Sequence, residues 1–179
     1  MTNVLNGRMT ADVEGEFVVF LIGFRINKPW KLHKWLPVFL AMPRILRELS
    51  ADPNSGLMGY MTPLIPTVMV QYWRSFDQLE AYARSKDHEH WPAWVAFNKR
   101  ISAAGGDVGI WHETYRVSSG QWETIYGGMP ATGLGKATSI IPITASRARA
   151  RQRLHHQVRE TDDASAAPIS SESGRGSHD

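Results

Sequence analysis

The segment spanning residues 16–26 constrains the fold more than any other, because it is apolar on both of its alternating faces. It reads EFVVFLIGFRI and is followed by the strand-breaking residues 27–29. β-Branched and aromatic residues of this kind favour a strand. A strand that is apolar on both faces needs cover on both sides of its sheet. We therefore predict a sheet with helices on one face and a second kind of cover on the other.

The rest of the folded region predicts alternating helices and strands. Residues 35–49 carry apolar side chains at helical spacing, with Pro37 in the first turn and Pro43 at a kink. Ser75 and Gln78 form a capping box that opens another helix. The remaining predicted elements are helices over 75–84 and 88–103 and strands over 57–62, 67–73, 108–117 and 121–126.

This order of elements predicts an α+β fold, the ferredoxin-like βαββαβ sandwich. In that fold both helices cover one face of an antiparallel sheet. The bare face has two candidate covers. One is a second copy of the chain, which makes a homodimer in the form of a dimeric α+β barrel. The other is the C-terminal strand region around residues 121–134.

The aromatic residues mark where the folded domain ends. All seven Trp lie before residue 123, and all Tyr and Phe lie before residue 127. A segment without such residues buries too little apolar surface to offset its chain entropy. We therefore predict an N-terminal extension over 1–15, a ferredoxin-like domain over 16–135 and a disordered basic tail over 136–179.

Composition excludes several classes of protein. There is no Cys, which rules out disulfides and thiolate chemistry. No apolar run reaches the roughly 18–20 residues needed to cross a bilayer, and residues 1–16 lack a secretory signal, so we expect a cytoplasmic protein without stable membrane insertion. Residues 1–135 hold 13 Lys/Arg and 12 Asp/Glu, and five Arg without any acid lie over 147–159. A basic excess in the tail does not predict a nucleic-acid-binding fold.

Several stretches together resemble one known family. They are GFRINKPWK at 23–31, YWRSFDQL at 72–79, HEHWPAW at 88–94 with FN at 97–98, GIWHETY at 109–115, and ETIY at 123–126 with MP at 129–130 and GLG at 133–135. Together they resemble the fumagillin-pathway polyketide monooxygenase-like family of the dimeric α+β-barrel superfamily. The resemblance covers about residues 16–138. It implies a monooxygenase-like protein, and it transfers no catalytic residue.

His112 is the best candidate for a catalytic group. Alternation puts it on one strand face with Ile110 and Thr114, in a strand predicted to be central or nearly so. A histidine in such a place suits a general base or, if haem is bound, an iron ligand. The alternative is a core histidine bonded to backbone. Asn98 and Tyr115 are the next candidates for catalysis.

Further residues are predicted to line a substrate pocket between the sheet and the two helices. Trp91 and Trp94 share one face of a helix with Asn98. The complete predicted pocket set is Trp91, Trp94, Trp111, Tyr72, Arg25 and His90. His88 and His90 point apart on a helix and do not match a His-Glu-x-x-His site, so no metal site is predicted.

Three functions compete at this stage. The first is a small monooxygenase-like enzyme, without cofactor, acting on an apolar oxygen-bearing molecule in secondary-metabolite tailoring or detoxification. The second, which the resemblance to the wider superfamily implies, is a haem-binding, dehydratase-like enzyme. The third is a non-catalytic ligand-binding or stress-response barrel. The basic and aromatic residues around the first helix, together with the Arg-rich tail, also suggest contact with a membrane surface.

Overall fold

The larger of two sheets carries the ferredoxin-like α+β fold. The computed structural model describes residues 4–62, 68–86, 91, 95 and 106–154. The four-stranded sheet has the order β3-β4-β2-β5, and every neighbouring pair is antiparallel. Its strands are β2 (Phe17–Ile26), β3 (Leu57–Met61), β4 (Val68–Trp73) and β5 (Val108–Val117). The predicted strand, helix, strand, strand, helix, strand order is confirmed in the described part of the chain, except over 88–103, most of which lies outside it.

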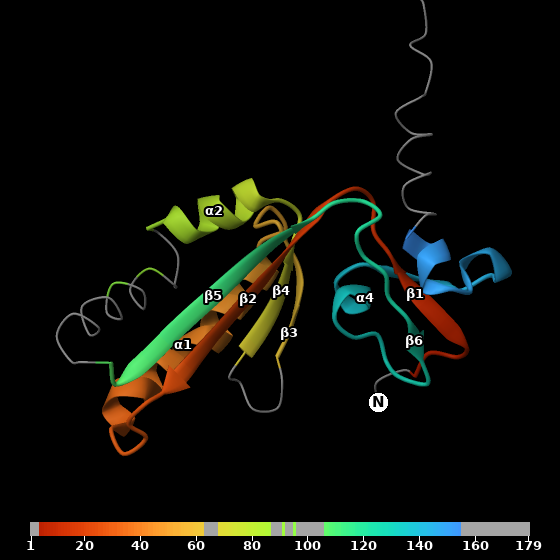
Figure 1. The fold of residues 1–179 in the computed structure, drawn as a ribbon. Helices are drawn as coiled ribbons and strands as arrows, with labels where there is room; N and C mark the ends of the chain where they lie inside the picture. The colour runs from red at the N-terminus through yellow and green to blue at the C-terminus, as the bar shows by residue number, and fades with distance from the viewer. Residues whose placement is uncertain (1–3, 63–67, 87–90, 92–94, 96–105, 155–179) are drawn as a thin grey trace, which may run out of the picture.

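The helices α1 (Leu32–Ala51) and α2 (Phe76–Arg84) pack on the same face of this sheet. Their shared core contains Val18 from β2, Trp73 from β4, Leu49 from α1 and Leu79 from α2. Trp73 and Leu49 are fully buried. In the view of Figure 1, α1 passes behind the sheet. The helix-covered face predicted from the sequence is therefore observed.

Local signals set where both helices begin. The backbone N–H of Gln78 donates to the hydroxyl of Ser75 at 3.2 Å, which confirms the predicted capping box at α2. Helix α1 begins three residues earlier than predicted, so Pro37 lies inside the helix rather than in its first turn. The indole N–H of Trp35 donates to the carbonyl of Pro29 at 2.9 Å and ties the start of α1 to the preceding loop.

Strand β2 lies inside the sheet, and β5 lies at its edge. The two pair along their whole length, from Phe17 opposite Val117 to Ile26 opposite Val108. The expectation of a nearly central strand around His112 is wrong, because only β2 neighbours β5 in the described residues. Alternation within a strand reports its two faces and does not report how many neighbours it has.

A second, smaller sheet covers one end of the helix-free face. It has the order β6-β1-β7, formed by β1 (Arg8–Asp12), β6 (Tyr126–Gly127) and β7 (Ser139–Pro142). The short helix α4 (Leu134–Ala137) packs beside it. Their core joins Phe17 of β2 to Trp122 and Tyr126, and the rings of Phe17 and Trp122 meet edge-on at 6.0 Å. The region around 121–134 thus covers part of the helix-free face, which was one of the two covers predicted from the sequence.

The two ends of the chain differ from the predicted extension and tail. Residues 8–12 form a strand that pairs with residues 139–142, where an unstructured tail was expected. Short segments with few apolar residues fold here because they add to a core that residues 17–134 already supply: Ala11 is buried in that core, and Ile140 packs against it. Residues 155–179 of the predicted tail lie outside the described residues.

A buried arginine attaches the segment that follows β7. Arg153 is only 5% exposed. Its guanidinium donates twice to Glu123, at 2.9 and 2.6 Å, and also to the carbonyls of Arg147 and Ala148. A buried guanidinium is tolerated when its donors are satisfied in this way. The Arg-rich segment up to residue 154 is therefore held against the domain.

No helix within the described ranges has both the length and the apolar character that crossing a membrane requires.

Candidate functional site

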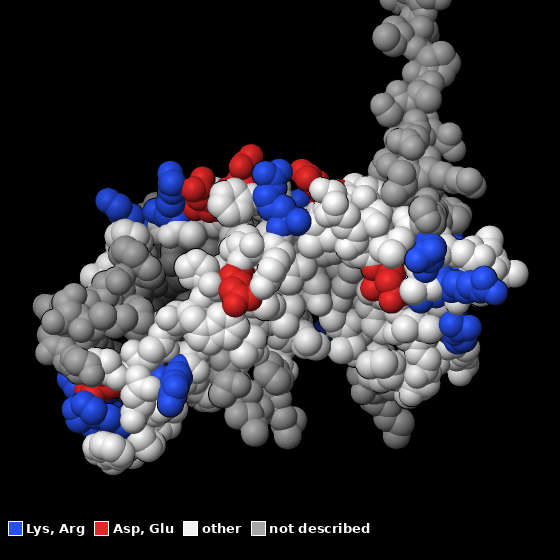
Figure 2. All heavy atoms as spheres, viewed as in Figure 1, with Lys and Arg blue, Asp and Glu red and all other residues white. Residues whose placement is uncertain are grey.

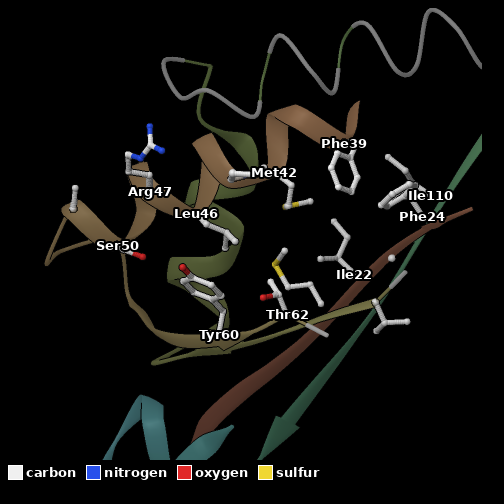
Figure 3. A pocket seen from close by; sticks show the side chains of 15 residues that line it. Ile22, Phe24, Phe39, Met42, Leu46, Arg47, Ser50, Tyr60, Thr62 and Ile110 are labelled. Carbon is white, nitrogen blue, oxygen red and sulfur yellow. The ribbon is translucent and has the colours of Figure 1, made fainter. Parts of the chain in front are cut away.

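A cavity of about 780 Å³ lies between α1 and the helix-covered face of the main sheet. We call it the α1 cavity. Figure 3 shows its side chains converging from α1 on one side and from the strands on the other. Its size is that of a site for a small organic molecule. A cavity thus lies between the sheet and α1, in the layer where a substrate pocket was predicted.

The wall of the α1 cavity is mainly apolar. From α1, Phe39, Met42 and Leu46 recur at helical spacing and point toward the sheet. The strands contribute Ile22, Phe24, Met69 and Ile110. The rings of Phe24 and Phe39 meet edge-on at 6.2 Å and join β2 to α1 at one end. This lining favours an apolar ligand.

Polar groups gather at the opposite end of the α1 cavity. Tyr60, Thr62 and Ser50 contribute hydroxyls, and in Figure 3 those of Tyr60 and Ser50 point toward the same end. Arg47 lies at the rim with its guanidinium directed away from the other lining side chains. A ligand with an oxygen at one end of an apolar body would place that oxygen among these hydroxyls.

Tyr60 was not found from the sequence. A β-bulge lies between Leu57 and Gly59, so Leu57 and Tyr60 both face the helices although they are three residues apart. A β-carbon at Gly59 would lie 2.7 Å from that of Ala137 in α4, so this position needs glycine. A glycine inside a strand was the available signal for a bulge.

His112 lies on the cavity side of the sheet, next to the α1 cavity. Its partner across the sheet is Ile22, and Ile110 is two residues away on the same face of β5; both of these line the cavity. The His112 ring packs against Phe20, with ring centroids 5.5 Å apart. The side chain is exposed, and β5 lies at the edge of the sheet. The alternative of a core histidine is therefore not observed in the single chain.

Three of the predicted site residues lie on the other face of the sheet. Trp111 and Tyr115 alternate with His112 along β5, and Arg25 lies on the corresponding face of β2. Tyr115 donates a hydrogen bond to Glu113, and this bond to a carboxylate raises the pKa of the Tyr115 phenol. None of the three lines the α1 cavity. The structure thus separates Tyr115 and Trp111 from His112.

Tyr72 has a structural environment. It packs against Phe17 in the core between the two sheets. Burial raises the pKa of the Tyr72 phenol, the neighbouring Tyr126 adds to this effect, and a hydrogen bond to the backbone of Leu134 opposes it. The hydroxyl of Tyr126 accepts a hydrogen bond from the backbone N–H of Gly135 at 2.8 Å. The two tyrosines therefore hold α4 in place rather than line the predicted pocket.

The other predicted site residues lie in or near the segment 87–105. Trp91 is half-buried, with the Lys86 ammonium 5.7 Å from its ring centroid, and does not line the α1 cavity. His90, Trp94 and Asn98 lie outside the described residues. Within the described part of the chain, no three His, Asp or Glu side chains cluster as metal ligands.

Asp107 holds the loop that leads into α1. Its carboxylate is 2.9 Å from the ammonium of Lys28 and 3.0 Å from that of Lys31. Its backbone carbonyl accepts hydrogen bonds from the N–H groups of Asn27 and Lys28. The hydrogen bond from Lys28, followed by that from Lys31, lowers the pKa of the Asp107 carboxyl. This cluster positions the start of the helix that forms one wall of the α1 cavity.

Replacing Asp107 by Asn is expected to lower the melting temperature at neutral pH. A lowered folded-state pKa stabilises the fold above the unfolded-state pKa, and this contribution is lost as the pH falls through the folded-state pKa. The difference in melting temperature between wild type and Asp107→Asn should therefore shrink in acid. Thermal unfolding from neutral to acidic pH measures it, with the exposed Asp12→Asn as control. A difference that stays constant with pH would contradict the ion-pair cluster.

Comparison with known families identifies the domain. The model of the family described as monooxygenase af470-like matches residues 17–134. The chain belongs to this family, and the resemblance found from the sequence is confirmed. The match covers the main sheet, both of its helices and the start of α4. Among curated proteins, no match was found.

Proposed function

We propose that this member of the monooxygenase af470-like family is an enzyme that oxidises an apolar, oxygen-bearing small molecule held in the α1 cavity. Membership of the family supports a monooxygenase-like function. The proposed substrate class rests on the lining of the cavity, which is an apolar wall with hydroxyls at one end. Secondary-metabolite tailoring and detoxification are the roles that such a substrate suits.

The proposed chemistry starts with proton removal by His112. The imidazole accepts a proton from a carbon of the ligand whose carbanion is stabilised by a neighbouring oxygen function. The carbanion then gives its electron pair to O₂, and protonation yields a hydroperoxide. Loss of water from that hydroperoxide, with the second hydrogen of the same carbon, leaves a carbonyl. What supports this role is the position of His112 beside Ile22 and Ile110 at the edge of the cavity.

The haem-dependent alternative fits the described residues less well. A haem iron in the α1 cavity would need a protein ligand in its wall. The described lining residues include no histidine, and His112 lies beside the cavity on an exposed edge strand. A visible absorption spectrum of the purified protein tests this, because bound haem absorbs strongly near 400 nm.

A non-catalytic binding protein is the second candidate. The observation that favours it is that the described lining residues include neither a carboxylate nor an imidazole. Such a protein would bind the same class of apolar ligand and leave it unchanged. The two candidates therefore differ in whether oxygen is consumed.

Oxygen uptake by the purified chain tests the proposed function. The panel of compounds consists of apolar enolisable ketones, each with an acidic CH₂ group beside its carbonyl. We expect saturable oxygen consumption with at least one of them and without added cofactor. Binding of each compound is measured by displacement of Nile red. Binding without any oxygen uptake would favour a non-catalytic binding protein and overturn the proposed enzyme activity.

A homodimer is expected through the uncovered part of the helix-free face. Trp111, Tyr115 and Met61 are 39%, 50% and 36% exposed there, next to the half-buried Leu21 and Val70. In Figure 2 the middle of this face is mainly uncharged, and Glu113, which accepts the hydrogen bond of Tyr115, lies on the same face of β5. An apolar surface of this kind is typical of an interface. A second copy placed on it would complete the predicted barrel.

Replacing Trp111 by Glu is expected to give a monomer. Burial of an unpaired carboxylate in an interface costs several kcal/mol, which is enough to dissociate a dimer at micromolar concentration. Analytical ultracentrifugation should show wild type near twice 20.1 kDa. Trp30→Glu is the matched control, because Trp30 is 73% exposed and lies outside this sheet face. A wild type that is strictly monomeric would refute the barrel and leave the ferredoxin-like domain intact.

A further inference from the structure

A row of large apolar side chains lies exposed along α1. Leu32, Leu36 and Leu40 are 55%, 40% and 50% exposed, and Trp30 just before the helix is 73% exposed. Single exposed leucines are common in globular proteins, whereas an aligned row of them marks a contact surface. We call these four residues the α1 row.

The α1 row leads to the rim of the α1 cavity. Residues four apart on a helix are rotated by about 40°, so Leu32, Leu36 and Leu40 span an arc of about 80°. Pro43 and Arg47 fall within the same arc one and two turns further on, and both line the cavity. The exposed row and the rim of the cavity thus lie along one side of the helix.

The surroundings of the α1 row are basic. Residues 28–47 contain five Lys or Arg and no Asp or Glu. Arg44 and Arg47 are exposed, and the guanidinium of Arg47 points away from the cavity. Lys28 and Lys31 bind Asp107 while remaining 38% and 35% exposed. In Figure 2, basic side chains gather around the N-terminal end of α1, at the lower left.

Exposed apolar side chains surrounded by basic ones favour one kind of binding partner for the α1 row. A second copy of the same face would bring two basic surfaces together, which repel each other. Leucines on a helix, with a tryptophan just before it and cations around both, match an anionic lipid surface, where the apolar groups enter the acyl boundary and the cations meet phosphate groups.

We propose that the protein docks on anionic lipid surfaces through the α1 row, with Arg44 and Arg47 at the level of the lipid phosphates. The helix lies in the plane of the lipid surface and does not cross it. Docking in this orientation places the rim of the α1 cavity at the lipid, so an apolar ligand passes between them without crossing water. Only this last consequence rests on the proposed function.

Co-sedimentation with vesicles tests the docking. The full chain is mixed with phosphatidylcholine vesicles that contain or lack phosphatidylserine, at low and at high salt. We expect binding to the anionic vesicles at low salt and a large reduction at high salt or without phosphatidylserine. No binding to anionic vesicles, or equal binding to both kinds, would overturn the proposal.

Two variants locate the contact on α1. The double substitution Leu36→Ser and Leu40→Ser is expected to weaken vesicle binding at least about tenfold. Arg44→Ser is expected to weaken it about fivefold at low salt. Ile125→Ser is the matched control, because Ile125 is an apolar residue that is 48% exposed outside α1. Wild-type binding by the double variant would overturn the proposal.

The vesicle experiment is independent of the proposed enzyme activity. Nile red uptake by the α1 cavity, measured without lipid, should be unchanged in Arg44→Ser. If the protein binds vesicles but no compound supports oxygen uptake, the docking proposal stands and the proposed enzyme activity is wrong. If oxygen is consumed but vesicles are not bound, the proposed enzyme activity stands and the docking proposal is wrong.

Discussion

Replacement of Met42 by Asp is expected to remove nearly all binding of apolar ligands to the α1 cavity. Met42 is half-buried and points from α1 into the apolar wall. A ligand that fills this space must strip water from the new carboxylate, and an unpaired carboxylate in an apolar site costs several kcal/mol. Binding of Nile red should therefore weaken by at least about a hundredfold, because each 1.4 kcal/mol is worth tenfold.

The same substitution at Met129 is the matched control. Met129 is 37% exposed and does not line the cavity, so Met129→Asp should bind Nile red like wild type. Thermal unfolding of both variants checks that the fold is retained. Wild-type affinity in a folded Met42→Asp protein would show that apolar ligands bind elsewhere, and the proposed substrate site would then be wrong.

Replacement of His112 by Ala is expected to lower turnover at least about a hundredfold with little change in stability. A positioned general base contributes about 10²–10⁴-fold to a rate. Because the side chain is exposed on an edge strand, its removal costs the fold little packing beyond the contact with Phe20. Oxygen uptake with an active compound measures turnover, and Nile red binding shows whether the cavity is unchanged.

Two further variants separate base chemistry from packing at this position. His112→Gln keeps much of the shape and cannot act as a base, so it should be as inactive as His112→Ala. His33 is also an exposed histidine, but it lies in α1, so His33→Ala should keep full turnover. Full turnover by His112→Gln would exclude His112 as the base. Tyr60, the phenol inside the cavity, would then be the next residue to replace.

Much of the element order was predictable, because it depends on local patterns. The two-faced apolar run at 16–26 and the alternating run at 108–117 agree with β2 and β5 within one residue. The capping box at Ser75 marks the start of α2. These patterns arise from the period of a helix or strand and from hydrogen bonds over three residues, both of which can be read along the chain.

The candidate site was less predictable, because it depends on which faces meet. Alternation along the strand already put Trp111 and Tyr115 on the face opposite His112, and the sheet agrees. The sequence did not show which of the two faces the cavity lies on. The bulge beside Gly59 turned Tyr60 toward the helices, against the simple alternation of the strand. The sequence predicted that the region of α1 is basic and aromatic. The exposed fractions of Leu32, Leu36 and Leu40 were needed to define the α1 row.

The sequence by itself determined the strands of the main sheet, the helices α1 and α2 and their ferredoxin-like order, because periodicity and capping act between near neighbours. The predicted strand over 121–126 is limited to Tyr126 and Gly127. Only the tertiary structure decided that β5 is an edge strand, that His112 is exposed, and that residues 8–12 pair with 139–142. Local composition does not report such pairings. Segments that are too polar to fold alone are ordered here by a core that distant residues build.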